Sequence, residues 1–381
     1  MDFEISEDQR QALDGWTRFI GQEIAPIVRS FHDKAMTREM AHALIRKMVP
    51  FGVGAGWLPE DGGGMGLDFL TSGLLFEALA YVSPDVAGLA WVAEGAALKV
   101  YSNGSPSIKE AYLPGIMGGE LIGCSAISEP GIGSSVREMR TTAVRSGGGY
   151  RLNGEKLWIS NAAVADFVLV MAKTADQEFS MFLVDREKHG FEVHEIDKLG
   201  LNGWPLAQIR FDDVLVSEEY MLGAPGAGLR ETMKGFARSR CFVSTLALGI
   251  AKAALDASVD YAKQRMQFGK PIAAHQMVQG LLAQMATDFS ASQLLVYRAL
   301  SLMSQGRRCD LEASIAKSFA TEAAQRITSS AIQVHGAAGI ARDLPLERHF
   351  RNARMLTIPD GTTQINQLII GRYLTGIDAF H

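Results

Sequence analysis

The sequence predicts a multidomain α+β protein in which a helical domain, a β-rich domain and a second helical domain follow one another along 381 residues. Two observations carry this prediction. Long stretches with helical character occupy both ends of the chain, and short apolar or alternating runs between turn residues fill the middle. A chain of this length exceeds the size at which a single core stops growing, so two or three domains are expected.

The first domain, residues 1–120, is expected to be helical. Ser6-Glu7-Asp8-Gln9 has the form of a capping box, and apolar residues recur behind it at helical spacing as far as Ile27. The stretch from Phe69 to Tyr101 is apolar and rich in alanine, with few helix breakers, so it predicts buried helices that continue to about Tyr112.

The middle domain, residues 121–228, is expected to form a β-barrel or β-sandwich. Gly147-Gly148-Gly149 and Asn153-Gly154 predict turns between strands, because Asn-Gly is the strongest short hairpin signal. The runs that predict strands lie at 167–171, 181–184, 191–196 and 208–211.

The last domain, residues 229–381, is expected to be a bundle of long helices. It follows the glycine-rich segment 223–228, and its alanine- and leucine-rich stretches are 246–264, 275–305 and 310–333. No internal repeat or flexible linker separates the three segments, so they are expected to pack as one body.

Composition excludes several classes of function. The net charge of −5 provides no basic surface, which disfavours nucleic acid and anionic membranes as partners, and no apolar run has the length expected of a membrane span. The first four residues lack the features of a signal peptide. The eight histidines show no metal-ligand spacing, so no metal is expected. The three cysteines are too far apart for a disulfide framework and favour the cytoplasm: Cys124, Cys241 and Cys309.

Six polar or glycine-containing segments carry the chemical information. Each is weak alone, because a glycine-rich loop is more often a turn than a ligand site. In order they are Ser128-Glu129-Pro130-Gly131-Ile132-Gly133-Ser134, Trp158-Ile159-Ser160-Asn161, Arg265-Met266-Gln267-Phe268-Gly269-Lys270-Pro271-Ile272, Gln333-Val334-His335-Gly336-Ala337-Ala338-Gly339, Glu347-Arg348-His349-Phe350-Arg351 and Asp360-Gly361-Thr362-Thr363-Gln364-Ile365.

Together these segments resemble the acyl-CoA dehydrogenase family from the opening helix to about Tyr373. The resemblance implies an N-terminal helical domain, a middle β-domain and a C-terminal four-helix bundle, with FAD bound between the last two. It also implies a homo-oligomer, a tetramer or a dimer, in which a neighbouring subunit completes the adenine end of the FAD site.

The resemblance also implies roles for residues at the flavin. Trp158 would form an apolar wall, and Ser128 and Ser160 would hydrogen-bond the flavin ring. Taken alone, Trp158 is better explained as a core residue and Arg265 as a solvated charge. The residues carried over onto the diphosphate and adenine positions are Arg265, Phe268, Gln333, Gly336, Thr362 and Gln364.

Asp360 stands where the family keeps its catalytic glutamate. The resemblance implies that this carboxylate removes the acyl α-proton while the β-hydrogen passes as hydride to flavin N5. It further implies that the backbone N–H of the base and a ribityl hydroxyl of FAD stabilise the enolate. Aspartate is one methylene shorter than glutamate, which reduces its reach by roughly 1.5 Å. The local sequence Pro359-Asp360-Gly361 is also a common turn, and Ser239 occupies the alternative base position known in some members.

The substrate contacts implied by the resemblance are Ser134, Arg240 and Gly361. Ala237 replaces a carboxylate that contacts CoA in well-known members. This change fits an acyl group on a carrier protein, as in a subgroup active in secondary metabolism, and equally an unusual CoA ester. Glu94 is a lone carboxylate in an apolar helix and is expected to be structural rather than a second base.

Three alternatives remain open from the sequence. A nitroalkane-oxidase-like flavin oxidase would use an aspartate base and oxygen, a related monooxygenase would bind reduced flavin loosely, and a catalytically inactive member would act as a scaffold. The electron acceptor of a dehydrogenase would be an electron-transfer flavoprotein or oxygen.

Overall fold

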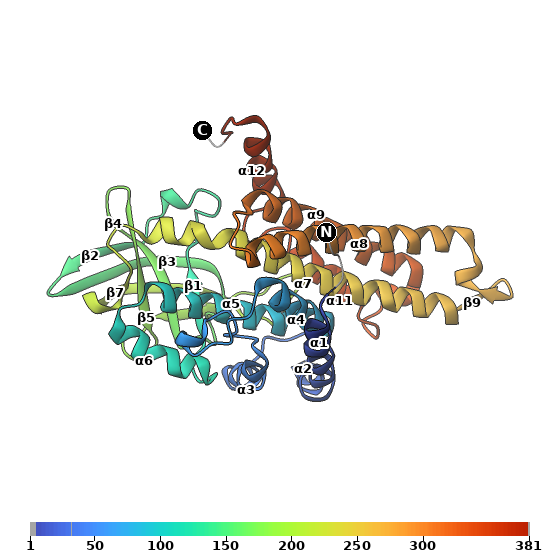
Figure 1. The fold of residues 1–381 in the computed structure, drawn as a ribbon, viewed down its shortest axis with the longest axis horizontal. Coiled ribbons are helices and arrows are strands. Elements are labelled where there is room, and N and C mark those ends of the chain that lie inside the picture. Colours follow the sequence, from blue (N-terminus) through green and yellow to red (C-terminus); the bar gives the residue numbers. More distant parts are fainter. Residues whose placement is uncertain (1–4, 32, 380–381) are drawn as a thin grey trace.

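A computed structural model describes residues 5–31 and 33–379, and within them the order of elements is helical, then β, then helical (Figure 1). The segment 1–4 and His32, which entered the sequence-based expectations, lie outside the described residues. The β-domain and the free ends of the long C-terminal helices lie at opposite ends of the molecule's long axis.

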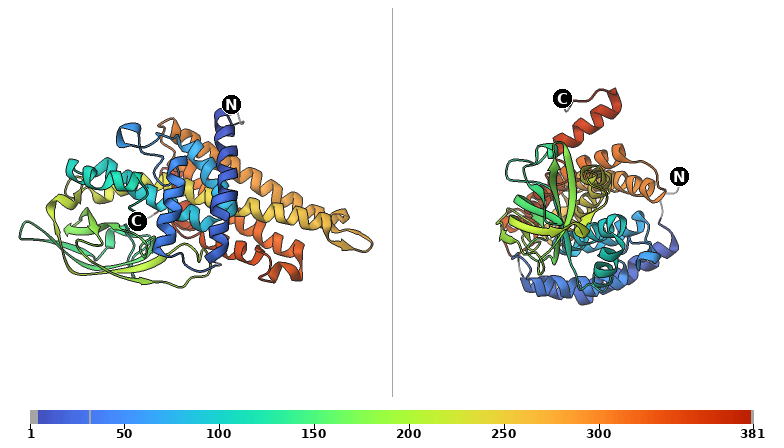
Figure 2. Two further views of the ribbon diagram at one scale, coloured as in Figure 1. Left: turned by 90° about the horizontal axis from the view of Figure 1, so that it is seen from below. Right: turned by 90° about the vertical axis from the view of Figure 1, so that its left-hand side faces the viewer.

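The N-terminal helices cross the middle of the molecule (Figure 2). Ser6 and Gln9 bond each other's backbone N–H groups, which confirms the capping box at the start of α1. The opening helix continues through one π-helical segment, Ile20–Ile24, into α2. The helices are α1 (Glu7–Phe19), α2 (Ala25–Phe31), α3 (Arg38–Met48), α4 (Phe69–Val82), α5 (Pro84–Asn103) and α6 (Pro106–Met117).

The middle of the chain forms an eight-stranded sheet in the order β6-β7-β3-β2-β4-β5-β8, with β1 pairing in parallel with β4. Most other pairs are antiparallel, and apolar side chains fill one core beneath β3, β4 and β7. The strands are β1 (Gly123–Ala126), β2 (Thr142–Ser146), β3 (Gly149–Ser160), β4 (Phe167–Ala175), β5 (Glu178–Asp185), β6 (Glu192–Glu195), β7 (Leu206–Ser217) and β8 (Met221–Leu222).

The prediction of a turn at Asn153-Gly154 is wrong, because this pair lies inside β3. The register against β7 shifts between Leu152 and Gly154, which marks a β-bulge. Gly154 has a φ of +144°, and a Cβ there would come within 2.7 Å of the Thr141 backbone. Glycine is thus required by the bulge and by close approach of the neighbouring chain, while Gly147 and Gly148 make the turn into β3.

The C-terminal helices pack with α4 and share a large apolar core with the N-terminal domain. Phe242 on α7 lies 5.1 Å from Phe76 on α4, measured between ring centroids. The elements are α7 (Gly228–Gln264), the hairpin β9 (Met266–Gln267) and β10 (Lys270–Pro271), α8 (Gln276–Ser304), α9 (Asp310–His335), α10 (Ala337–Ile340), α11 (Leu346–Met355) and α12 (Thr363–Thr375).

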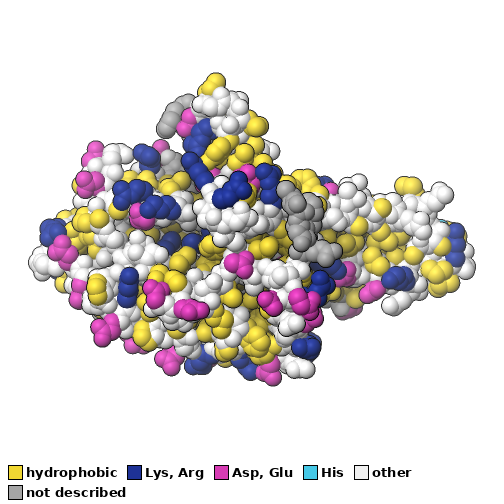
Figure 3. All heavy atoms as spheres, viewed as in Figure 1, with side chains coloured by type: hydrophobic (Ala, Val, Ile, Leu, Met, Phe, Trp, Pro, Cys, Tyr) yellow, Lys and Arg dark blue, Asp and Glu magenta, His cyan; other side chains and the backbone are white. Residues whose placement is uncertain are grey.

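The helix α7 corrects one expectation from composition. It is 37 residues long and contains an apolar window with a mean hydropathy of 1.4, which by length and composition alone suffices for a membrane span. However, 72% of that window is buried inside the protein, as in the core helices of many globular proteins. On the face shown in Figure 3, apolar, basic and acidic side chains are interspersed.

Candidate functional site

Asp360 lies in the short loop that joins α11 to α12, in a left-handed backbone conformation with a φ of +54°. The next residue, Gly361, also has a positive φ, of +96°. A non-glycine residue pays roughly 1–2 kcal/mol for this conformation, and such residues cluster at functional sites. Trp158 and Phe268, both expected at the cofactor, share the feature, with φ values of +64° and +52°.

A buried lysine holds this loop in place. Lys317 on α9 donates hydrogen bonds from Nζ to the carbonyl oxygens of Thr357, at 2.9 Å, and Gly361, at 2.7 Å. Asn366 on α12 donates from Nδ2 to the same Gly361 oxygen at 2.8 Å. The Asp360 backbone is therefore fixed from two helices. Lys317 was not among the residues predicted from the sequence, where its only signal is a charge amid alanines on a helix face that is otherwise buried.

Burial raises the pKa of the half-buried Asp360 carboxyl, and three cations oppose this shift: Lys317, Arg240 and Lys99. Burial likewise lowers the pKa of Lys317, to about 8, while the Asp360 charge opposes that shift. Asp360 forms no ion pair within the described residues, so its carboxylate is free to accept a proton from a ligand. A carboxylate with a raised pKa is better matched to proton abstraction near neutral pH.

Arg240 reaches the same region from α7 and is almost fully buried. Burial lowers the pKa of its guanidinium, which the Asp360 carboxylate opposes. Its Nε atom is buried without a hydrogen-bond partner in the part of the chain that the structure describes. A buried cationic donor with an unused N–H points to a ligand as its partner.

The loop that carries Ser128 and Ser134 is tied to β3. Ser128 donates from Oγ to the Leu157 carbonyl oxygen at 2.6 Å, and Leu157 N–H donates back to the Ser128 carbonyl. A buried ion pair of 2.9 Å between Lys156 and Glu129 secures the same loop. Ser134 is exposed at its tip.

Trp158 lies near the end of β3 and is 56% exposed, so it is not a core tryptophan. Ser160 lies half-buried at the end of the same strand. Thr362 caps α12, since its hydroxyl accepts from the Ile365 N–H at 3.3 Å, and the neighbouring Gln364 is exposed.

The remaining residues expected at FAD lie elsewhere. Arg265 and Phe268 belong to the β9–β10 hairpin, at the end of the long axis opposite the β-domain (Figure 1), and Phe268 is 92% exposed. Gln333 and Gly336 lie at the adjoining end of α9, where His335 stacks on Tyr261 with 4.2 Å between ring centroids. One copy of the chain therefore does not bring the two sets of residues together.

The residues present fit a flavin dinucleotide. Exposed aromatic rings at Trp158 and Phe268 offer flat apolar contacts, which buried core residues would not. Arg265 is exposed and can pair with phosphate, and a Cβ at Gly336 would meet no atom within 4 Å, so this turn is open to a ligand. No cluster of metal-ligating side chains occurs in residues 5–31 and 33–379.

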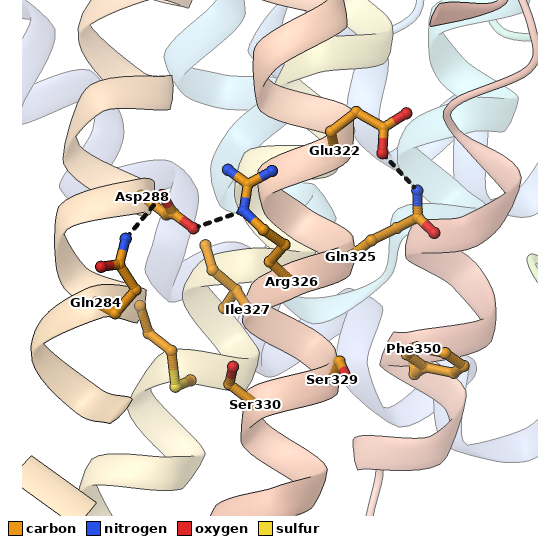
Figure 4. Close-up of a pocket in the computed structure, with 10 residues that line it drawn as sticks. Gln284, Asp288, Glu322, Gln325, Arg326, Ile327, Ser329, Ser330 and Phe350 are labelled. Atoms are coloured by element: carbon orange, nitrogen blue, oxygen red, sulfur yellow. Dashed lines mark hydrogen bonds and ion pairs between the residues drawn. The ribbon is translucent and has the colours of Figure 1, made fainter. Parts of the chain in front are cut away.

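A cavity lies beside the start of α12 (Figure 4), because Glu322 in its lining accepts a hydrogen bond from the Thr363 hydroxyl at 2.6 Å. It has a volume of about 590 Å³ and lies among α8, α9 and α11. Several of its polar side chains are paired with one another, as in the 3.0 Å ion pair between Arg326 and Asp288. None of the residues expected to bind FAD or substrate lines it.

Glu94 is held as a structural acid. Its two carboxylate oxygens accept backbone N–H groups of Trp57, at 2.6 Å, and Gly54, at 3.1 Å. Burial raises its pKa to about 8, against the effect of these bonds and of the Arg238 cation. This geometry agrees with the sequence-based expectation and shows that Glu94 stabilises the turn before α4.

Comparison with known proteins covers the three segments in turn. Models of the N-terminal, middle and C-terminal domains of acyl-CoA dehydrogenase match residues 6–120, 124–214 and 226–375. An acyl-CoA dehydrogenase of Bacillus subtilis (strain 168) is 37% identical over 372 residues, which span 94% of this chain and 95% of the relative.

Solved structures show the same fold throughout. Butyryl-CoA dehydrogenase from Megasphaera elsdenii superposes with a TM-score of 0.92 at 31% identity, covering 98% of this chain and 100% of the other. PigA, in a structure with FAD and proline, has a TM-score of 0.91 at 30% identity and coverages of 98% and 99%. The chain belongs to the acyl-CoA dehydrogenase family, whose members are FAD-dependent oxidoreductases that act on CH–CH bonds.

Proposed function

We propose that this protein dehydrogenates an acyl thioester between its α- and β-carbons, with Asp360 as the base. The observation that carries the proposal is the Asp360 loop itself. It presents a half-buried carboxylate whose pKa is raised by burial, in a backbone conformation fixed by Lys317. Such a group is preorganised to take a proton from carbon rather than to exchange it with solvent.

The reaction needs a proton acceptor and a site for the developing enolate charge. The Asp360 carboxylate accepts the α-proton. The backbone N–H of Asp360 donates no hydrogen bond to residues 5–31 or 33–379, so it is available to the thioester oxygen. FAD, when bound, supplies the acceptor for the β-hydrogen and its electron pair.

Two copies of the chain would build each FAD site. Ser128, Trp158 and Ser160 would hold the flavin end from one subunit, and Thr362 and Gln364 of the same subunit would reach the diphosphate. The exposed hairpin and helix end of a second subunit would meet the adenine end through Arg265, Phe268, Gln333 and Gly336. Support comes from the wide separation of the two sets within one chain and from the exposure of Phe268. A dimer, or a tetramer of two dimers, satisfies this requirement.

The thioester would be carried either by CoA or by a carrier protein. Arg240 has an unused buried N–H, Ser134 is exposed at its loop tip, and Gly361 borders the base, so all three remain candidates for contacting it. Ala237 stands where the family has a carboxylate, which suits a carrier-protein substrate of secondary metabolism and equally an unusual CoA ester. All three cysteines are free and buried, and this supports a cytoplasmic location.

The decisive test is anaerobic mixing of the purified flavoprotein with matched acyl-CoA and acyl-carrier-protein thioesters. Loss of the flavin's visible absorbance with either class supports the proposal, and the responsive class identifies the handle. Adding an electron-transfer flavoprotein or oxygen to the reduced enzyme then identifies the acceptor. Reduction by nitroethane without response to any thioester would instead favour the nitroalkane oxidase, for which the aspartate base is the supporting observation. Purified protein without flavin would favour a scaffold.

A further inference from the structure

Two cationic side chains, Lys99 and Arg238, have no direct part in the proposed reaction. Lys99 on α5 donates from Nζ to the Ser125 hydroxyl on β1 at 2.9 Å, and it forms no ion pair within the described residues. An ammonium group has three donors, so this one retains hydrogen-bonding capacity. The side chain lies within electrostatic range of Asp360, which places it at the candidate site.

Arg238 is the second of these cations and approaches from α7. Its guanidinium lies 5.1 Å from the centroid of the Trp57 ring and makes no hydrogen bond to the described part of the chain. The charge of Glu94 acts on it, yet the oxygens of Glu94 accept backbone N–H groups, and no ion pair joins these two described side chains. Arg238 therefore retains all five of its N–H donors.

The surroundings of Lys99 and Arg238 disfavour the charged form of both side chains. Burial, and in smaller part the charge of Arg238, lowers the pKa of Lys99 to about 8, so the two groups act on one another as like charges. Burial also lowers the pKa of Arg238, to about 10. The other groups in range are Asp360 and the thiol of Cys124, whose pKa burial raises to about 12. Both side chains are half-buried, so their charges are only partly solvated. An anion between the two cations relieves their repulsion.

We propose that Lys99 and Arg238, with the Ser125 hydroxyl, form an anion-binding subsite for a carboxylate on the acyl part of the substrate. The inference rests on the proposed thioester dehydrogenation and specifies its substrate class. Asp360 would work at the α-carbon, while the far carboxylate of a dicarboxylic monothioester binds the two cations. Trp57 and Phe242, with ring centroids 4.5 Å apart, contribute apolar surface near Arg238.

The test compares pairs of thioesters that differ only at the far end. Succinyl with butyryl, glutaryl with pentanoyl and adipoyl with hexanoyl are offered as CoA and as pantetheine esters to the holoenzyme. The expected result is a higher kcat/KM for flavin reduction by the dicarboxylic member of at least one pair. Calorimetric binding of the same pairs to the Asp360→Asn holoenzyme should show the same preference without turnover.

Variants assign the preference to the two cations. Lys99→Met and Arg238→Met should each reduce the preference about 10- to 100-fold, the amount expected for one charged hydrogen bond. Lys99→Arg should retain part of the preference. The control is Lys47→Met, at a lysine on α3 that pairs with Glu23. This substitution should leave the preference for the dicarboxylic thioester unchanged. Flavin content and melting temperature establish that each variant is folded.

Two outcomes separate the inference from the proposed function. Equal turnover and equal binding of charged and neutral thioesters, or a preference that survives both Met substitutions, overturns the subsite and leaves the dehydrogenase intact. No flavin reduction by any thioester overturns the proposed function, and the subsite falls with it.

Discussion

The Nζ atom of Lys317 lies 2.7 Å from the carbonyl oxygen of Gly361, the residue that follows the candidate base. This contact joins α9 to the loop between α11 and α12 and fixes the direction of the Asp360 side chain. It also places a cation where it favours the ionised form of the base. Lys317 therefore contributes both to the position of Asp360 and to its proton affinity.

Lys317→Met should slow flavin reduction while leaving FAD bound. The substitution leaves two carbonyl oxygens without their donor, so the free energy of unfolding should fall by about 1–3 kcal/mol. Because a cation near Asp360 is lost, the acidic limb of the pH–rate profile should also move to higher pH. Stopped-flow reduction across a pH series measures both effects. A lower Tm with an unchanged pH limb would reduce Lys317 to a purely structural role.

The pH dependence of the unmodified enzyme follows from the raised pKa of Asp360. The rate of flavin reduction should fall as the pH drops through a value above 3.9, the ordinary pKa of aspartate. The contribution of Asp360 to the free energy of unfolding has the opposite dependence on pH. A carboxyl group whose folded pKa is raised contributes most below its unfolded pKa, and the contribution is lost as pH rises to the folded pKa. Asp360→Asn should therefore destabilise the protein least, or stabilise it, at neutral pH, as urea titrations at two pH values would show.

Glu94→Gln should keep substrate-dependent flavin reduction. The side chain holds backbone N–H groups of Trp57 and Gly54, and an amide nitrogen cannot accept one of these bonds. Stability should fall by about 1–3 kcal/mol as a result. Denaturant unfolding measures the loss of stability, and stopped-flow kinetics measures the rate of flavin reduction. Complete loss of reduction in folded, yellow protein would make Glu94 part of the chemistry.

Shared FAD sites predict complementation between inactive variants. Phe268→Ala should weaken FAD binding, and Asp360→Asn should remove the base, so each homo-oligomer should be inactive. After subunit exchange, a mixed dimer contains one site with an intact Asp360 from one copy and an intact Phe268 from the other. Flavin reduction should reappear in the mixture. The control mixes Asp360→Asn with Trp158→Ala, two changes on the same side of the site, so no mixed site is intact. Restored activity in this control would contradict the shared site. So would a lack of activity in the first mixture.

The sequence predicted the order of domains because helical periodicity and short apolar strand runs follow directly from local geometry. It failed at Asn153-Gly154, where the bulge in β3 and the approach of Thr141 decide the conformation and no local pattern reports them. Tertiary contacts override local turn preference at such a position.

Some residues of the candidate site could be predicted from the sequence, and others could not. Asp360 and Arg240 were found because they stand within recognisable motifs. Lys317, Lys99 and Arg238 were missed because a single cation on a helix is ordinarily solvated. Only the packing shows that the charges of Lys317 and Lys99 act on the base and that the charge of Arg238 acts on Lys99. Phe268 and Trp158 lie far apart in one chain, and the proposed pairing of the two at one FAD depends on a second copy, which one sequence does not describe.

The most direct test of the central claim is stopped-flow flavin reduction by Asp360→Asn beside Asp360→Glu and the unmodified enzyme. The thioester that reduces the unmodified enzyme is used at saturation, and FAD content is matched. If Asp360 is the base, the Asp360→Asn protein is yellow and folded, binds the thioester and does not reduce its flavin, while Asp360→Glu retains a measurable rate. Flavin reduction by Asp360→Asn at the normal rate would contradict this claim.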